Sequence, residues 1–140
     1  MNRYVVAVTG ASGLIYAREL LAYFATRPDL ELHAVISRAG EQVLSLELGM
    51  SPKDLAPGAI WHPVDDFTSG LASGSFRARA MVVIPCSMGT LGAISQGVGP
   101  SLPQSSGANR VATAAYAFFI AAHAAESGGH LHLRLSLRRF

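Results

Sequence analysis

The chain has 140 residues, of which half are hydrophobic and 14% are charged, and its formal net charge is +2. This length suffices for one domain with a sizeable core, and so weak a charge balance argues against a nucleic-acid partner. No apolar run reaches the roughly 18 residues of a membrane span, and the N-terminus lacks a signal-peptide pattern, so we expect a cytoplasmic protein without a membrane anchor. The single cysteine excludes an internal disulfide and a cysteine-based metal cluster, and we expect no bound metal.

The chain begins with alternating strand and helix patterns. Tyr4 to Thr9 is a short β-branched run that ends in a glycine turn, which is typical of a strand buried on both faces. Apolar residues then recur at helical spacing from Leu14 to Ala25, and Arg27-Pro28-Asp29 ends that helix. Leu30 to Ile36 predicts a second strand, followed by a helix that includes Glu41 to Glu47. This order predicts an α/β fold with a parallel sheet.

The middle of the chain contains a long polar segment before the next buried strand. Ser51 to Ser75 is rich in Pro, Gly, Ser and Asp, which predicts a loop with one short strand around His62 to Val64. Such a long loop in a compact domain is usually functional. Ala80 to Pro85 predicts a strand, Cys86 to Thr90 its terminal loop, and Leu91 to Gln96 the start of another helix.

Small polar residues follow three of the predicted strands. They are Gly10-Ala11-Ser12-Gly13, Ser37, and Ser87-Met88-Gly89-Thr90. Because the carboxyl ends of parallel strands meet at one edge of a sheet, we expect all three loops to line a ligand site there. Backbone N–H groups and hydroxyls at the start of a helix can hold a phosphate, and glycine permits close approach of the ligand.

Two other interpretations of the first loop remain open. The loop can be a tight turn between a strand and a helix, with no ligand. It also resembles a nicotinamide-binding loop of an NADP-dependent short-chain reductase, in which Arg38 would suit a 2′-phosphate. That fingerprint requires a third glycine where this chain has Tyr16, and no catalytic Tyr-x-x-x-Lys pattern follows.

Four motifs in succession resemble those of the UbiX flavin prenyltransferases. They are Thr9-Gly10-Ala11-Ser12-Gly13 with Tyr16, Val35-Ile36-Ser37-Arg38-Ala39, Ala72-Ser73-Gly74-Ser75, and Met81 to Leu91. The order and spacing match over roughly residues 3 to 102. The resemblance implies a flavodoxin-like fold, a three-layer arrangement around a parallel sheet, and a homo-oligomer, which is usually a dodecamer in this family.

The resemblance also implies a reaction. Members bind FMN and dimethylallyl phosphate, join the dimethylallyl group to flavin N5 and C6, and supply the prenylated flavin to UbiD-type decarboxylases. By resemblance the FMN contacts are Gly10, Ala11, Ser12, Ser37, Ser87, Met88, Gly89 and Thr90.

The resemblance assigns roles near the reacting atoms to four residues. Ser12 would lie near N5, where its hydroxyl could relay a proton, and Glu47 could assist that transfer or be a solvated helix residue. Phe67 and Ser73 would border the substrate pocket, although Phe67 equally suits a core contact. Cys86 has no histidine near it in sequence, so we expect a buried thiol and not a nucleophile.

The resemblance stops near residue 102. The family continues with an arginine-alanine-alanine-aspartate helix and later basic and acidic motifs that hold the FMN phosphate and the prenyl phosphate, and none follows here. We therefore distinguish an FMN-binding part, 1–102, from a divergent C-terminal part of the same domain, 103–140. Within the latter, Ala112 to Ala125 favours a helix and Leu131 to Leu137 a strand.

Two hypotheses explain the change at that point. Residues 103–140 contain no Lys, no Asp and one acidic residue, Glu126, which is typical of an out-of-frame translation of a GC-rich gene. The alternative is a divergent or shortened homologue. Either way, the loss of counter-charges predicts weak or absent FMN binding and little prenyl transfer, and a non-catalytic flavin-binding remnant is the limiting case.

Overall fold

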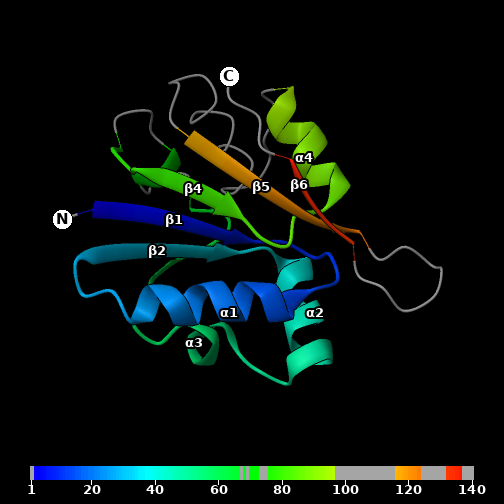
Figure 1. The fold of residues 1–140 in the computed structure, drawn as a ribbon, viewed down its shortest axis with the longest axis horizontal. Helices are drawn as coiled ribbons and strands as arrows, with labels where there is room; N and C mark the ends of the chain where they lie inside the picture. The colour runs from blue at the N-terminus through cyan, green and yellow to red at the C-terminus, as the bar shows by residue number, and fades with distance from the viewer. Residues whose placement is uncertain are drawn as a thin grey trace.

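The structure is a computed structural model, and it describes residues 2–66, 68, 70–72, 76–96, 116–123 and 132–136. These residues form a six-stranded sheet with the order β3-β2-β1-β4-β5-β6 (Figure 1). The strands are β1 (Asn2–Val8), β2 (Leu30–Ile36), β3 (Ile60–His62), β4 (Ala80–Val83), β5 (Tyr116–His123) and β6 (His132–Ser136). The helices are α1 (Leu14–Ala25), α2 (Arg38–Leu48), α3 (Pro52–Leu55) and α4 (Met88–Ser95), and Gly70–Ala72 forms a 3-10 turn.

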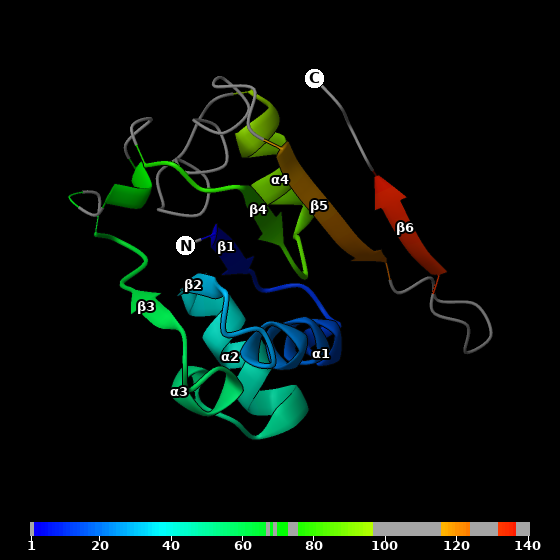
Figure 2. The ribbon, with the colours of Figure 1, turned by 60° about the vertical axis from the view of Figure 1, so that its left-hand side comes forward.

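Helices cover both faces of the sheet, which confirms the three-layer α/β, flavodoxin-like fold (Figure 2). On one face Val6 and Val8 of β1 pack against Leu14 and Leu21 of α1 and Leu44 of α2. On the other face the alternate residues of the strands pack against α4 and the 3-10 turn. That second cluster consists of Val5, Ala7, Val35, Leu71, Met81, Val83, Cys86 and Ile94. Strands buried on both faces explain why β1 and β4 are almost continuously apolar.

The register of the sheet brings three strand ends together. The β1–β2 pair is parallel from Asn2 opposite Leu30 to Val8 opposite Ile36, and β4 pairs with the other side of β1. The carboxyl ends of β1, β2 and β4 therefore lie side by side. This is the edge that the sequence predicted for the three polar loops.

Local capping explains two differences from the predicted elements. The segment expected to be a loop contains α3, because Ser51 and Asp54 form a reciprocal capping box with Pro52 at the first helical position. The short strand that follows is Ile60–His62, two residues earlier than expected. Likewise α4 begins at Met88 rather than Leu91, because the Ser87 side chain caps it.

The C-terminal part corrects two further expectations. The helix predicted within Ala112 to Ala125 is wrong over Tyr116–His123, which forms β5 and pairs in parallel with β4. A uniformly apolar run suits a buried strand as well as a helix, and pairing with β4 decides the outcome. The strand predicted within Leu131 to Leu137 is confirmed as β6, but it runs antiparallel to β5, so the sheet is not wholly parallel.

Candidate functional site

Hydrogen bonds join the three polar loops at the carboxyl edge. The buried Thr9 hydroxyl donates to the carbonyl of Pro85 at 2.7 Å and accepts from the backbone N–H of Ser87 at 2.9 Å. The N–H of Ser37 donates to the carbonyl of Val8 at 2.9 Å. The loops after β1, β2 and β4 are therefore held next to one another, as expected from the sequence.

α2 and α4 begin in the same way at this edge. The Ser37 hydroxyl accepts from the N–H of Gly40 at 3.0 Å, and the Ser87 hydroxyl accepts from the N–H of Thr90 at 3.2 Å. Within the described part of the chain, the N–H groups of the two intervening residues in each helix, Arg38 and Ala39 or Met88 and Gly89, have no protein acceptor. Free N–H groups at a helix N-terminus attract an anion, so both helices suit a phosphate.

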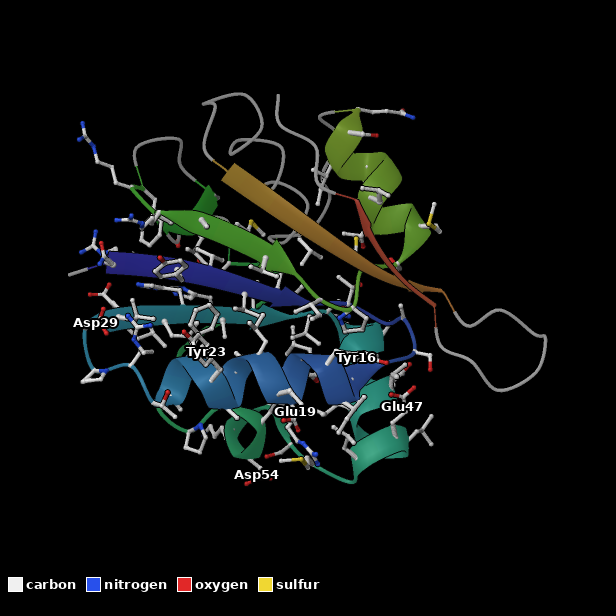
Figure 3. All side chains as sticks on the ribbon, in the orientation of Figure 1. Tyr16, Glu19, Tyr23, Asp29, Glu47 and Asp54 are labelled. Carbon is white, nitrogen blue, oxygen red and sulfur yellow. The ribbon has the colours of Figure 1, made fainter. Side chains whose placement is uncertain are left out.

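α1 differs, because an acidic side chain already occupies its N-terminus. Glu47 of α2 accepts hydrogen bonds from the Ser12 hydroxyl at 2.7 Å, the N–H of Gly13 at 3.2 Å and the N–H of Leu14 at 3.0 Å. Figure 3 shows Glu47 beside the start of α1. The N–H groups of the first glycine loop therefore bind a carboxylate of the protein itself, which leaves α2 and α4 as the better places for a phosphate.

This arrangement determines the charge of Glu47. Burial acts to raise the pKa of the Glu47 carboxyl, but the hydrogen bonds from Ser12, Leu14 and Gly13 together outweigh it and hold the pKa below its ordinary value. Glu47 is therefore ionised at neutral pH and accepts the hydrogen of Ser12. The two predicted catalytic residues, 35 positions apart in the chain, are in direct contact.

Two glycines of the loops have different surroundings. A Cβ on Gly10 would overlap the Cβ of Ala39, so packing of the loop against α2 requires glycine there. A Cβ on Gly89 would meet nothing within 4 Å, so the start of α4 faces open space. Ala11 and Ser12 lie in the loop between β1 and α1, and Met88 is 68% exposed at the same edge.

Other sequence predictions have separate outcomes. Cys86 is buried, and burial raises the pKa of its thiol to about 11, which opposes a nucleophilic role. Phe67 and Ser73 lie outside the described residues. No three metal-binding side chains gather in the part of the chain that the structure describes, and no helix there is long and apolar enough to cross a bilayer.

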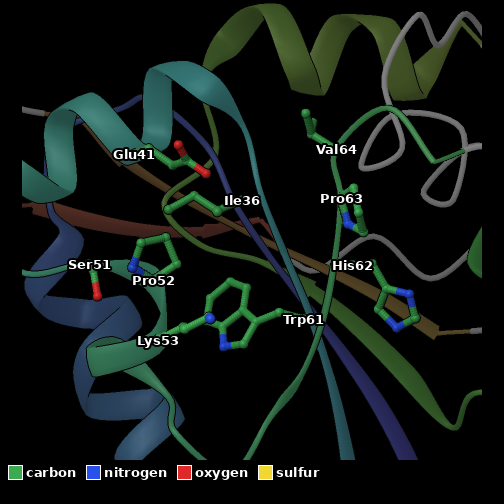
Figure 4. Close-up of a pocket in the computed structure, with 9 residues that line it drawn as sticks. All are labelled: Ile36, Glu41, Ser51, Pro52, Lys53, Trp61, His62, Pro63 and Val64. Atoms are coloured by element: carbon green, nitrogen blue, oxygen red, sulfur yellow. The ribbon is translucent and has the colours of Figure 1, made fainter.

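A groove lies beside the loop after β2, between α2, α3 and β3. Its volume is about 420 Å³. The groove is lined by Ile36, Glu41, Ser51, Pro52, Lys53, Trp61, His62, Pro63 and Val64 (Figure 4). The sequence pattern did not identify this groove, because α3 was expected to be a loop.

Comparison with known proteins identifies the family to which this chain belongs. The Flavoprotein family model matches residues 1–119. The chain belongs to the Flavoprotein family. Within it the chain is a UbiX-type homologue, 40% identical over 95 residues to the flavin prenyltransferase UbiX of Escherichia coli K12, a match that covers 67% of this chain and 50% of that protein. The flavin prenyltransferase LpdB of Lactiplantibacillus plantarum is 42% identical over 103 residues, covering 73% and 55%.

Solved structures of UbiX-type proteins share the fold. AnUbiX (PadA1), in complex with FMN and dimethylallyl pyrophosphate, superimposes with a TM-score of 0.83 and 31% identity, covering 90% of this chain and 67% of that chain. A dodecameric FMN-dependent UbiX-like decarboxylase from Escherichia coli O157:H7 gives 0.84 and 30%, covering 89% and 69%. The chain spans about half the length of the curated relatives it matches.

The structure also adds a residue that sequence reasoning missed. Thr9 was treated only as the end of a strand, yet its hydroxyl links the loops after β1 and β4. The available signal was a polar side chain at the end of an otherwise apolar strand. Its partners could not be inferred, because Pro85 and Ser87 are more than 70 positions away.

Proposed function

We propose that this chain binds FMN at the carboxyl edge of β1, β2 and β4 and belongs to a UbiX-type flavin prenyltransferase. The observation that carries the proposal is the pair of helix N-termini at this edge, α2 and α4, whose first N–H groups have no acceptor among the described residues. The membership in the UbiX group supports FMN over a nicotinamide cofactor. The proposed contacts are Gly10, Ala11, Ser12, Ser37, Ser87, Met88, Gly89 and Thr90.

The donor set suits a phosphate-bearing cofactor. The N–H groups of Arg38, Ala39, Met88 and Gly89 can bind phosphate oxygens without a cationic side chain, and the open space above Gly89 admits a bulky group. Bound FMN would supply the N5 and C6 atoms that receive the dimethylallyl group.

Ser12 and Glu47 suit the movement of one proton. The Ser12 hydroxyl points its hydrogen at the ionised Glu47 carboxylate, so it can accept a proton on its own oxygen while passing its hydrogen to Glu47. The N–H groups of Gly13 and Leu14 hold the carboxylate in place for that transfer. Ser12 is the proposed relay and Glu47 the proposed proton acceptor.

The remaining partners follow from the same proposal. Dimethylallyl phosphate is the substrate, and a UbiD-type decarboxylase in the cytoplasm uses the product. Leu46 of α2 is 86% exposed and Met88 of α4 is 68% exposed, and apolar side chains in such positions support contact with further copies of the chain. We propose a homo-oligomer, as in the dodecameric relative.

The C-terminal part limits this activity. Residues 103–140 lack the arginine, lysine and acidic motifs expected from the resemblance, so the phosphates of FMN and of the substrate would have few counter-charges. We propose weak FMN binding and little prenyl transfer by this chain, with 103–140 as the divergent or frame-shifted part.

Two measurements on the purified full chain test the proposal. FMN is titrated while its visible absorption and fluorescence are recorded, with NADPH as the competing ligand. Reduced FMN and dimethylallyl phosphate are then incubated with the chain, and prenylated flavin is measured by mass spectrometry. We expect weak saturable FMN binding and little product. Binding of NADPH but not FMN would contradict the flavin site, and stoichiometric flavin with efficient transfer would contradict the proposed role of 103–140.

A further inference from the structure

A row of polar side chains crosses the sheet on the face opposite α1. Arg3 of β1 and Glu31 of β2 are register partners, and Arg3 Nε donates to Glu31 Oε1 at 2.9 Å. His33 Nε2 lies 2.7 Å from the same carboxylate oxygen. On its other side, His33 Nδ1 lies 2.8 Å from Nε2 of His62, the last residue of β3. The row thus connects the edge strand β3 to the centre of the sheet.

His33, at the centre of the row, is sheltered from water, whereas Arg3 at its end is exposed. His33 is only 6% exposed, and the ring of Phe76 packs edge-on against it with centroids 5.0 Å apart. The guanidinium of Arg3 lies 5.5 Å from the centroid of the same Phe76 ring. A buried imidazole with both nitrogens hydrogen-bonded is sensitive to any change in proton number, because water cannot replace a lost partner.

Hydrogen-bond chemistry limits how many protons the two rings can hold. The Glu31 carboxylate only accepts, so His33 Nε2 carries a hydrogen. His33 Nδ1 and His62 Nε2 then share one hydrogen, which either ring can donate. The pair keeps this contact after binding one further proton, since a cationic ring still donates to a neutral neighbour. A second proton puts a hydrogen on both facing nitrogens, and the contact is lost.

At neutral pH the surrounding charges favour the state in which the His33–His62 hydrogen bond is intact. Glu31 is shared between His33 and Arg3, so it supplies one counter-charge and no more. Burial, and then the charge of His33, lower the pKa of His62 below its ordinary value, whereas Asp66 beyond β3 acts to raise it. Arg3 and Glu31 lie beside His33, Asp66 acts on His62, and Glu41 of α2 and Lys53 of α3 line the groove that His62 also lines.

We propose that Glu31, His33 and His62 form a pH-operated latch that holds β3 and Pro63 to Asp66 against the sheet at neutral pH and releases them in mild acid. β3 has only three residues and pairs with β2 alone among the described strands, so its backbone ladder is short. The His33–His62 bond is therefore the polar side-chain contact that joins β3 to β2, in addition to the packing of Trp61 on the other face. The latch lies outside the proposed flavin site and does not depend on flavin binding.

The latch also controls the groove between α2, α3 and β3. Trp61 and His62 lie on opposite sides of β3 (Figure 4). Both residues contribute to the lining of the groove, and His62 also reaches the row through His33. Trp61 Nε1 donates to the carbonyl of Ala56 at 3.0 Å, which anchors the strand on the groove side. After release of His62, that bond and the packing of Trp61 and Val64 against the two apolar clusters still hold the segment, so the groove changes shape with pH but stays formed.

Trp61 is the chain's only tryptophan, which makes its fluorescence a direct report on β3. Emission of the full chain is recorded from pH 7.5 to 5, with far-ultraviolet circular dichroism to follow the whole fold. We expect a shift to longer wavelength below pH 6.5, the ordinary pKa of the His62 imidazole, without loss of secondary structure. Exchange protection of the His62 backbone amide, which the parallel register directs at β2, should fall about tenfold per pH unit over that range.

The direction in which pH changes the stability of the closed latch follows from proton linkage. Because the pKa of His62 is lowered in the closed state, the open state binds more protons, and the closed state is favoured above about pH 6.5 and weakens as pH falls. The variant H62Q keeps an amide that can donate or accept toward His33 Nδ1 and does not ionise. It should retain the neutral-pH emission down to pH 5. The control K53Q changes a groove residue outside the row and should retain the transition.

Imidazole nitrogen NMR of the unmodified chain gives a second readout that needs no variant. The shared His33–His62 hydrogen should disappear with the same midpoint as the Trp61 change. An unchanged emission of the native chain, a transition that persists in H62Q, or histidine titration that is independent of Trp61 would each overturn the latch.

Discussion

Glu47 is the residue whose substitution tests the geometry of the candidate site most directly. Its carboxylate joins α2 to the start of α1 through Ser12, Gly13 and Leu14. E47A removes all of these acceptors. E47Q keeps one amide oxygen but removes the charge. Both variants leave the apolar cores unchanged, because Glu47 is an exposed residue.

The expected magnitude is modest for the same reason. A charged hydrogen bond in a buried site contributes about 1.5–3 kcal/mol, but water replaces the lost carboxylate here and screens its charge. Loss of a helix N-cap, the nearest equivalent, costs about 1 kcal/mol. We expect E47A to lower the free energy of unfolding by about that amount and E47Q by about half, corresponding to a fall in Tm of about 3 °C for E47A in a chain of this size.

Urea denaturation at pH 7 and pH 3.5, followed by far-ultraviolet circular dichroism, measures these differences. Because the pKa of Glu47 is lowered in the folded state, its stabilisation is present above the ordinary pKa of 4.5 and is lost as pH falls through the folded value. The deficit of E47Q should therefore shrink at pH 3.5. The control E19Q, in an exposed pair with Arg18, should change stability by less than about 0.5 kcal/mol.

The reasoning would be refuted by either of two results. A loss of more than about 3 kcal/mol of stability in E47A would indicate that the Glu47 carboxylate is buried, whereas the structure leaves this residue exposed. A deficit of E47Q that is equal at both pH values would show that the charge of Glu47 is not what the N–H groups of α1 bind.

Three further predictions concern the loops at the same edge. G10A should lose about 1–3 kcal/mol of stability, because its added Cβ overlaps Ala39. G89A, whose added Cβ meets nothing within 4 Å, should fold normally and bind FMN more weakly. Urea denaturation and FMN titration distinguish the two variants, and equal behaviour would contradict both assignments. S87A should lose about 1 kcal/mol in thermal denaturation because the cap of α4 is removed, while S95A, at the exposed end of the same helix, should be close to neutral. Native Cys86, with a pKa of about 11, should resist iodoacetamide at pH 8 and react once urea unfolds the chain, so rapid labelling of the folded protein would show that the thiol is accessible.

The sequence alone was sufficient where structure depends on near neighbours. The apolar runs predicted β1, β2 and β4, the helical spacing predicted α1 to its last residue, and the polar loops indicated where the strands end. α3 and the start of α4 were also accessible in principle, because Ser51 and Ser87 are caps whose partners are three residues away. These features depend on local sterics and hydrogen bonds, which a short stretch of sequence contains.

Only the tertiary structure decided the contacts between distant segments. The strand order places β4 beside β1, and this brings Ser87 to Thr9. Ser12 and Glu47 were predicted separately, and their direct bond depends on how α2 packs against α1. The Ala112 to Ala125 region shows the same principle in reverse, since pairing with β4 makes a strand of a segment that its composition left ambiguous. Such contacts join residues tens of positions apart, and their energies depend on packing that no local pattern contains.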